Sequence, residues 1–297
     1  LLLQIKKKLK HIQLIFMDKI IVVVTGANKG LGLAMVKGLC DKTDWIVYLT
    51  SRDVQRGLEA CKQLEILKNK PKYHQLDITN ETSIDTFYNY IKNTYDYVNL
   101  LVNNAGVLFL KDTTDTKLFQ AQQTMLVNFF SLVNFTEKML PIIKYGGKII
   151  NISSSSGHLS RIPSANLRNK LINAVDNSVA NLLELVKEYA VAVQESKAIE
   201  RGWGDSPYVV SKVGVNAYTF ILDRILRDRD IRVNCVHPGY VKSDMTRGAG
   251  TVTPDVAAMT PLYVALECNE NGVFMWHDRT IVPWDGPDPR GFIDEKI

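Results

Sequence analysis

The chain alternates between short apolar runs and longer stretches in which apolar residues recur at helical spacing. The short runs are rich in β-branched residues, which is typical of strands. Runs such as IIVVVT and KIINI are apolar on both faces, as strands covered by helices on both sides should be. The predicted strands are Lys19–Thr25, Trp45–Thr50, Lys72–Leu76, Asn99–Val102, Lys148–Ile152 and Ile231–Val236, with a seventh near Gly272–Trp276.

The regular alternation of strands and helices indicates the fold class. It predicts an α/β fold built on a doubly wound parallel sheet of six to seven strands. No repeat or low-complexity linker divides the chain, so we interpret residues 17–297 as one domain. Met17 stands just before the first strand and is interpreted as the natural start. Residues 1–16 are therefore treated as an N-terminal extension outside the fold.

One long segment, about residues 158–205, interrupts this alternation. Within it, the sequence NSVANLLELVKEYAVAVQESKAIE has a helical apolar period and too few Gly or Pro residues for a disordered loop. We predict an inserted helical hairpin, with two helices between about Ser164 and Arg201. Its apolar positions must be buried against another surface. These positions are Leu182, Leu183, Leu185, Val186, Tyr189 and Val193.

Composition and charge exclude several function classes. The net charge of +5 is mild and is spread along the chain apart from residues 6–8, so no basic stripe indicates nucleic-acid binding. No apolar run reaches the length of about eighteen residues that a membrane span requires. The four cysteines are scattered without metal-ligand spacing. We therefore expect reduced thiols, no metal site and a cytoplasmic protein.

A glycine-rich turn, TGANKGLG, joins the first predicted strand to the first predicted helix. Gly26 permits a tight turn, Gly30 lets backbone amides approach a phosphate, and Gly32 lets the helix pack close to the sheet. The helix N-terminus adds unpaired N–H groups and a positive dipole. A glycine triplet alone is weak evidence, but this position predicts a Rossmann-type dinucleotide site. Its candidate residues are Gly26, Asn28, Lys29, Gly30, Leu31 and Gly32.

The end of the second predicted strand indicates which dinucleotide binds. A fold that prefers NAD usually places Asp or Glu here, to hold the ribose hydroxyl. This chain has Ser51 followed by Arg52, with Lys29 in the glycine turn. Two cations converging on the adenosine end suit a 2′-phosphate, so we predict NADP(H) as the cofactor. The alternative is that Arg52 is only a solvated surface charge.

Three further motifs carry candidate chemistry. Tyr208 and Lys212 stand four residues apart, on one face of a helix, where the ammonium is expected to lower the pKa of the phenol and make it a better general acid. Ser154 follows a strand and can donate to a substrate carbonyl oxygen. Asn104 follows the fourth strand, and Asn128 lies on the next helix. Each motif alone also fits an ordinary turn or helix face.

Taken together, these motifs resemble the short-chain dehydrogenase/reductase family, whose order along the chain they follow. TGANKGLG, the strand-end serine, NNAG and YVVSK occur together, and the resemblance runs from about Asp18 to Val282. Within that family the chain is most similar to the monomeric carbonyl reductases. TGANKGLG, SRDVQRG, HQLDI, LVNNAGV, VNFF, HPGYVKSDM and TPLYVAL all look like that subgroup, as does the insertion before Tyr208.

The resemblance implies a role for each matching residue. Tyr208 would donate the proton, Lys212 would tune it and hold the nicotinamide ribose, Ser154 would orient the carbonyl, and Asn128 would anchor a water that links Lys212 to solvent. The implied reaction is reduction of aldehydes or ketones to alcohols by NADPH. Further cofactor contacts would come from Asp77 and Ile78 at the adenine, from Asn104 in the cleft, and from Pro238, Gly239, Val241 and Ser243 at the nicotinamide.

Several alternatives stay open at this point. The chain could be a non-catalytic NADP(H)-binding sensor or scaffold, or an oxidative alcohol or steroid dehydrogenase. The insertion could cover the helix face through which relatives pair, leaving a monomer, or it could form a lid over a small-molecule substrate. Tyr240 stands where the mammalian-type enzymes have Trp, and the stretch after Trp276 does not resemble that subgroup. The sequence therefore does not identify the substrate. An apolar pocket for quinones, aromatic ketones or lipid aldehydes is one hypothesis, formed by Val107, Leu108, Trp203, Tyr240 and Trp276.

Overall fold

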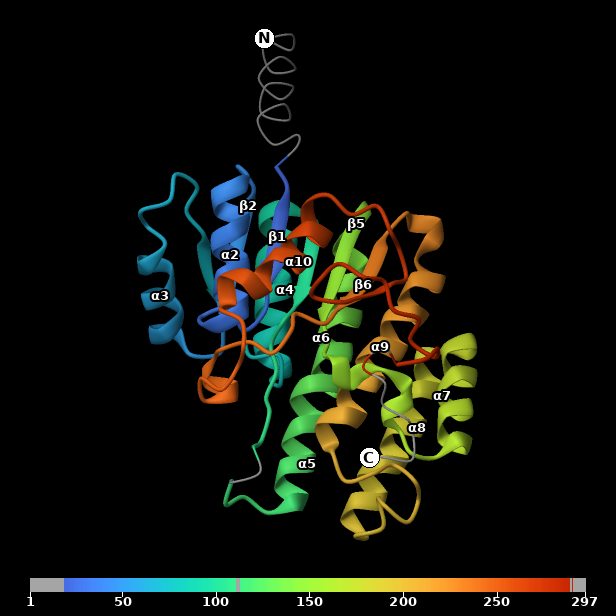
Figure 1. The fold of residues 1–297 in the computed structure, drawn as a ribbon. Helices are drawn as coiled ribbons and strands as arrows, with labels where there is room; N and C mark the ends of the chain where they lie inside the picture. Colours follow the sequence, from blue (N-terminus) through green and yellow to red (C-terminus); the bar gives the residue numbers. More distant parts are fainter. Residues whose placement is uncertain (1–18, 111–112, 289, 291–297) are drawn as a thin grey trace, which may run out of the picture.

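A parallel sheet lies at the centre of the computed structural model, which describes residues 19–110, 113–288 and 290 (Figure 1). Within these residues the sheet has seven strands in the order β3-β2-β1-β4-β5-β6-β7, which confirms the doubly wound α/β fold. Residues 1–16 and Met17 lie outside the described residues. The strands are β1 (Ile21–Val24), β2 (Ile46–Ser51), β3 (Lys72–Gln75), β4 (Val98–Asn103), β5 (Ile143–Ile152), β6 (Arg232–Val236) and β7 (Phe274–Met275).

The strands lie where the apolar runs predict them, although their ends differ, with the largest differences in β1, β5 and β7. β5 begins at Ile143 rather than at Lys148, because Ile143 pairs with Val98 before the register shifts and the regular ladder with β4 resumes at Leu100. β7 has only two residues, paired with the end of β6. The strand order reverses between β1 and β4, and ligands of such sheets bind at this reversal, beyond the carboxyl ends of the strands.

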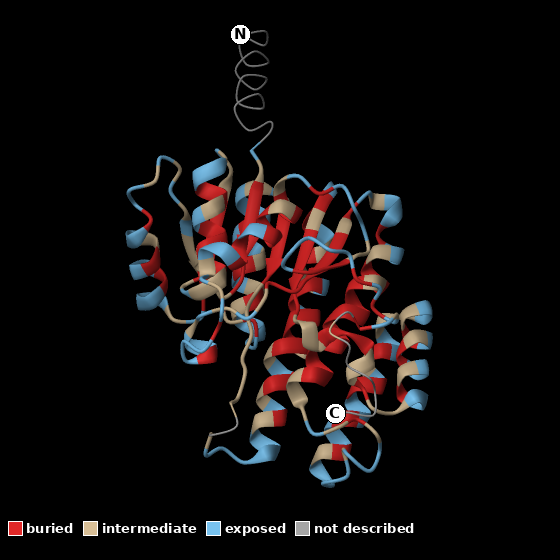
Figure 2. Cartoon of the chain, in the orientation of Figure 1, coloured by how far each residue is buried: buried red, intermediate tan, exposed pale blue. Residues whose placement is uncertain are grey.

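Helices cover both faces of the sheet, so the strands are buried on both sides (Figure 2). Val22 and Val24 of β1 face one apolar core, and Ile21 and Val23 face the other. The first core is closed by α2 (Gly30–Lys42), α3 (Val54–Gln63) and α10 (Pro254–Leu266). The second is closed by α4 (Glu81–Tyr95), α5 (Lys117–Met125), α6 (Ser131–Met139) and α9 (Pro207–Ile225). None of the described helices is long and apolar enough to cross a membrane.

The insertion forms the predicted helical hairpin, α7 (Ala165–Asn177) and α8 (Val179–Gln194). Ser164 and Ser178 cap the two helices by accepting hydrogen bonds from backbone amides of their first turns. Leu182, Val186 and Tyr189 of α8 are buried in the same core as α9. Both helices pack against α9, and α8 also contacts α5. The hairpin therefore covers the outer faces of two helices of the central fold.

Candidate active site

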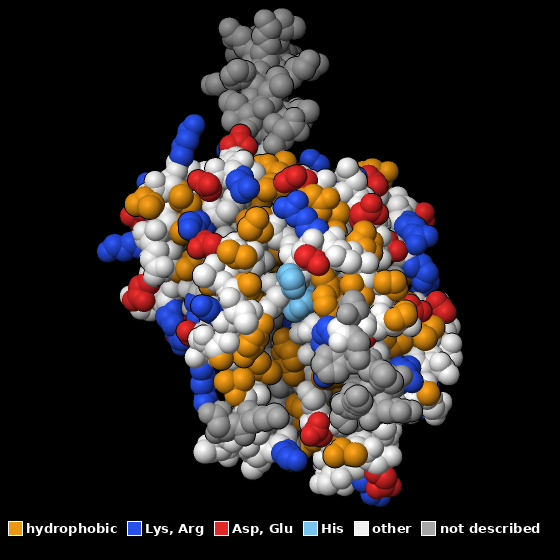
Figure 3. Space-filling model, viewed as in Figure 1, with side chains coloured by type: hydrophobic (Ala, Val, Ile, Leu, Met, Phe, Trp, Pro, Cys, Tyr) orange, Lys and Arg blue, Asp and Glu red, His pale blue; other side chains and the backbone are white. Residues whose placement is uncertain are grey.

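A cleft of about 840 Å³ opens at the carboxyl edge of the sheet. Its walls come from the glycine turn after β1, from the segments that follow β2, β3, β4, β5 and β6, and from the start of α9. Figure 3 shows this face of the molecule hollowed beside a histidine, with hydrophobic side chains gathered in the hollow. Every predicted cofactor-binding residue lines the cleft: Gly26, Asn28, Lys29, Gly30, Leu31, Gly32, Arg52, Asp77, Ile78, Asn104, Tyr208, Lys212, Pro238, Gly239, Val241 and Ser243.

The glycine turn lies in direct contact with the end of β4. A Cβ on Gly26 would lie 2.8 Å from the Cα of Ala105, and a Cβ on Gly32 would lie 2.5 Å from Nδ2 of Asn104. That Nδ2 atom donates hydrogen bonds to the carbonyl oxygens of Thr25, at 2.8 Å, and of Gly26, at 3.1 Å. A larger residue does not fit at either position, because the glycine turn and the segment after β4 approach too closely. Asn104 holds the turn in place.

The start of α2 fits a phosphate group. Gly30 has a φ of +57°, and a Cβ there would meet only Ser243, at 3.7 Å, so the space in front of the helix is open. The N-cap residue, Lys29, makes no side-chain cap, and the first turn holds no acidic residue. Its amides therefore keep their donors for a ligand, as binding of a pyrophosphate requires.

The adenosine end of the cleft corrects one detail of the sequence reading. Ser51 is buried, and its hydroxyl donates to the backbone oxygen of Asp53 at 2.8 Å, so Ser51 does not line the cleft. Arg52 is exposed and lines it. A further cation there, Arg56, was missed; it lies in the first turn of α3, and Arg52 lies just before that helix. Arg56 pairs with Asp53 at 3.1 Å.

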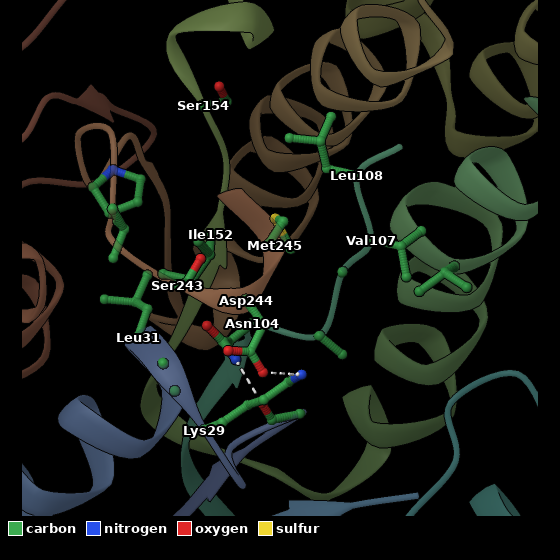
Figure 4. A pocket seen from close by; sticks show the side chains of 18 of the residues that line it. Lys29, Leu31, Asn104, Val107, Leu108, Ile152, Ser154, Ser243, Asp244 and Met245 are labelled. Atoms are coloured by element: carbon green, nitrogen blue, oxygen red, sulfur yellow. Dashed lines mark hydrogen bonds and ion pairs between the residues drawn. The ribbon is translucent and has the colours of Figure 1, made fainter. Parts of the chain in front are cut away.

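Lys29 has an ion-pair partner that the sequence did not reveal. Its ammonium lies 2.7 Å from Oδ2 of Asp244, which follows β6 (Figure 4). Both side chains are largely exposed, so this bond joins the two rims of the cleft at little energetic cost or gain. A phosphate that binds Lys29 therefore has to share it with Asp244.

Ser154, Tyr208 and Lys212 meet in the deeper part of the cleft. Tyr208 lies in the first turn of α9, which Ser206 caps by accepting from the amide of Val209. Lys212 is one turn later; its Nζ donates to the carbonyl oxygen of Ile152 at 2.8 Å and lies 5.7 Å from the centre of the Tyr208 ring. The hydroxyl of Ser154 lies close enough to the Tyr208 phenol to lower its pKa. The two polar groups that a carbonyl oxygen needs thus lie side by side.

The pKa values of this pair differ from the sequence expectation. Burial raises the pKa of Tyr208, and the nearby Ser154 side chain opposes that shift only in part. Burial also lowers the pKa of Lys212 to about 8. The expectation that Lys212 lowers the pKa of Tyr208 is therefore wrong for the chain alone, because desolvation is the dominant cause. A raised pKa keeps the phenol protonated near neutral pH, as a proton donor requires.

Asn128 lies behind the cleft rather than in its wall. It sits in a π-helical turn, Leu126–Phe130, which joins α5 to α6 and which the sequence pattern did not predict. Its Oδ1 accepts from the amide of Val107 at 2.7 Å, and its Nδ2 donates to the carbonyl of Val107 at 2.9 Å. These bonds fix the segment after β4 against the helix, and in the described part of the chain Asn128 makes no direct hydrogen bond to Lys212.

The apolar end of the cleft is only partly as predicted. Val107, Leu108 and Tyr240 line it, and so does Met245, which was missed. Trp203 packs on Tyr189 inside the insertion, and Trp276 packs on Phe274. Neither tryptophan is part of the cleft wall, because both are buried in cores that the sequence could not locate.

Two polar residues of the wall were also missed. His237 lines the cleft, and burial, with His277 nearby, lowers its pKa to about 3, so its imidazole is neutral at neutral pH. Ser153 is buried beside Ser154, and its hydroxyl has no hydrogen-bond partner among the described residues. The motif HPGY contains His237 and the run of serines after β5 contains Ser153, so these motifs were the sequence signals that could have identified the two residues. The described part of the chain contains no cluster of three or more His, Cys, Asp or Glu side chains suited to a metal ion.

Comparison with known proteins identifies the family. The model of the short chain dehydrogenases matches residues 20–166 and 181–252. The chain therefore belongs to the short-chain dehydrogenase/reductase family. The unmatched stretch, residues 167–180, contains most of α7, whereas nearly all of α8 lies within the second matched segment.

Several proteins that are similar to this chain are named as reductases. Carbonyl reductase (NADPH) 3 of Rattus norvegicus is 35% identical over 89% of this chain and 98% of its own length. Carbonyl reductase (NADPH) 1 of the same species is 36% identical over 90% of this chain and 99% of its own length. Among solved structures, salutaridine reductase from Papaver somniferum has a TM-score of 0.78 at 27% identity, covering 86% of this chain and 99% of that one.

We expect the stability of the cofactor-free protein to depend on pH through Lys212. Its pKa is about 8 when folded and about 10.4 when unfolded, so between these values the unfolded chain binds more protons. The free energy of unfolding should therefore rise with pH, by roughly 2 kcal/mol between about pH 8 and pH 10.

Denaturant titrations of the wild type and of Lys212→Met over this range measure the effect. The Met variant lacks the titrating group, so the wild-type value should rise relative to it. A constant difference between the two proteins would show that Lys212 does not titrate near pH 8.

Proposed function

We propose that this chain reduces aldehyde and ketone carbonyls to alcohols with NADPH as the hydride donor. The observation that carries the proposal is the meeting of Ser154, Tyr208 and Lys212 in the same cleft as the glycine turn. The names of the carbonyl reductases similar to this chain support it. A non-catalytic binder has no need of a buried, protonated phenol beside a serine hydroxyl.

Each side chain has a distinct part in the proposed reaction. The bound cofactor supplies the hydride to the carbonyl carbon. Ser154 donates a hydrogen bond that orients the carbonyl oxygen and stabilises the charge that builds on it. Tyr208 holds its proton and releases it to the same oxygen, and Lys212 would hold the ribose of the bound cofactor beside it. Asn128 keeps the segment after β4 in position and anchors a water near Lys212.

The proposed cofactor is NADP(H) rather than NAD(H). Arg52 lines the cleft at the end of β2, where an acidic residue would repel a 2′-phosphate. Arg56 lies beside it, although Asp53 balances its charge. The Lys29 ammonium is shared with Asp244, so Arg52 is the cation on which discrimination depends most.

The proposed substrate is a small carbonyl compound with apolar substituents. Val107, Leu108, Tyr240 and Met245 line its end of the cleft, and the imidazole of His237 is neutral there. No nucleic-acid or membrane partner is proposed. We also propose that the described chain forms a single domain, since all seven described strands share one sheet, and that it works in the cytoplasm, where its four free cysteines would stay reduced.

Replacing Tyr208 by Phe tests the reaction. The variant should lose about 10² to 10⁴-fold in NADPH-dependent turnover of an aromatic aldehyde such as para-nitrobenzaldehyde, because the proton donor is gone. NADPH binding, followed by cofactor fluorescence, should change little. Tyr145→Phe, which removes an exposed phenol near the start of β5, at the opposite end of the strand from the cleft, serves as the control. If Tyr208→Phe keeps more than about a tenth of wild-type turnover, Tyr208 is not the proton donor.

Replacing Arg52 by Ala tests cofactor choice. The wild type should prefer NADPH over NADH by about ten to several hundred fold, since a charge pair at about 4 Å contributes roughly 1 to 4 kcal/mol near a surface. Arg52→Ala should raise the KM for NADPH and leave that for NADH nearly unchanged. Arg227→Ala removes an exposed arginine outside the cleft and is the matched control. Equal use of both cofactors by the wild type would contradict the assignment.

We further propose that the protein is a monomer. The α7–α8 hairpin packs on α9 and α5, and no described residue of segment 158–205 lines the cleft. These contacts support a hairpin that covers the helix faces available for pairing, rather than one that forms a lid over the substrate. A stable dimer needs on the order of 1,000 Å² of buried surface, and the covered helix faces no longer offer it. Sedimentation at micromolar concentration should give a single species near the chain mass of 33.5 kDa. A dimer that persists on dilution would refute this arrangement.

A further inference from the structure

The segment that ends the described chain is bonded to the turn that follows Ser154. Trp284 is buried, and its indole Nε1 donates to the carbonyl oxygen of Gly157 at 2.8 Å. In return, the amide of Leu159 donates to the carbonyl of Trp284 at 3.0 Å. Next to this pair, Nε2 of the fully buried His158 lies 3.0 Å from the carbonyl oxygen of Pro283. Three hydrogen bonds thus join Pro283–Trp284 to the turn Gly157–Leu159.

The Gly157 carbonyl is shared with the helix that carries Tyr208 and Lys212. Nδ2 of Asn216, one turn after Lys212 on α9, donates to the same oxygen at 2.9 Å. A carbonyl has two lone pairs, so Trp284 and Asn216 together satisfy it. The ring of Trp284 also packs on Phe220 of α9, with ring centres 5.5 Å apart. One buried oxygen therefore ties together the turn, α9 and the C-terminal segment.

This oxygen lies one tight turn from Ser154. The amide of Gly157 donates to the carbonyl of Ser154 at 2.9 Å, and the amide of Ser156 donates to the Ser154 hydroxyl oxygen at 3.1 Å. The turn is tightly packed against α9, because a Cβ on Gly157 would lie 2.9 Å from the carbonyl oxygen of Lys212. A shift of the Gly157 carbonyl is therefore passed on to the Ser154 hydroxyl.

We propose that Trp284 is a positioning residue for the carbonyl reduction proposed above, on which this inference rests. By holding the Gly157 carbonyl against α9, its indole N–H sets the place of the Ser154 hydroxyl relative to the Tyr208 phenol. Trp284 does not line the cleft and touches neither substrate nor cofactor in this arrangement. Its effect is on geometry, and a displacement of about 1 Å at a reacting group can cost a hundredfold in rate.

The variant Trp284→Phe removes the N–H and keeps an aromatic ring against Phe220. Its kcat for para-nitrobenzaldehyde should fall about tenfold, less than a full displacement of 1 Å would cost, while the KM for NADPH stays within about twofold. Trp276→Phe is the matched control, because the buried indole N–H of Trp276 has no hydrogen-bond partner among the described residues. Its kcat should stay within about twofold of wild type. Equal kcat values for the two variants would overturn the proposal.

A second comparison separates positioning from a general loss of structure. In a Ser154→Ala background, which should itself lose about 10² to 10³-fold, Trp284→Phe should cost less than about twofold more, because the hydroxyl that it positions is absent. A further tenfold loss in that background would show that Trp284 acts on the whole fold and would overturn the proposal. Absence of any NADPH-dependent turnover by the wild type would refute the proposed function itself. Wild-type turnover without a loss in Trp284→Phe would refute only the positioning.

Discussion

The contact between the glycine turn and the end of β4 is the constraint on which the rest of the site depends. Gly26 and Gly32 leave no room for a side chain, because Ala105 and Asn104 occupy the space where a Cβ would stand. The Asn104 amide then closes the gap by bonding to the backbone of the turn. With α2 held against the sheet in this way, its N-terminus points along the crevice at the reversal of strand order. The other walls of the cleft are arranged around that fixed end.

The reactive end of the cleft is held by burial rather than by charge attraction. Lys212 is almost fully buried and bonded to the carbonyl of Ile152, so its pKa falls, while that of Tyr208 rises. In the chain alone, both groups are thus shifted toward their neutral forms.

The C-terminal segment and the insertion support the same helix from different sides. The α7–α8 hairpin packs on α9, and Trp284 packs on Phe220 in the C-terminal half of that helix. These contacts help to explain why nearly every residue of α9 from Val209 to Leu222 is buried. A helix held on all sides keeps Tyr208 and Lys212 at fixed positions, and this rigidity is what a proton donor in a preorganised site requires.

The sequence by itself determined the order of elements, the parallel sheet and the cofactor-side residues of the cleft, but not Arg56, Ser153, His237 or Met245. It could do so because strand and helix periodicities are local, and because a parallel sheet brings all strand ends to one edge. The α7–α8 helical hairpin could be predicted for the same reason, from the helical apolar period around Leu182 and Tyr189. Only the tertiary structure decided what depends on distances between remote segments. The ion pair of Lys29 spans 215 positions of the chain, and the bond from Trp284 to Gly157 spans 127. The burial that reverses the expected pKa shift of Tyr208 and the placement of Trp203 and Trp276 in closed cores likewise follow from packing, which no local pattern encodes.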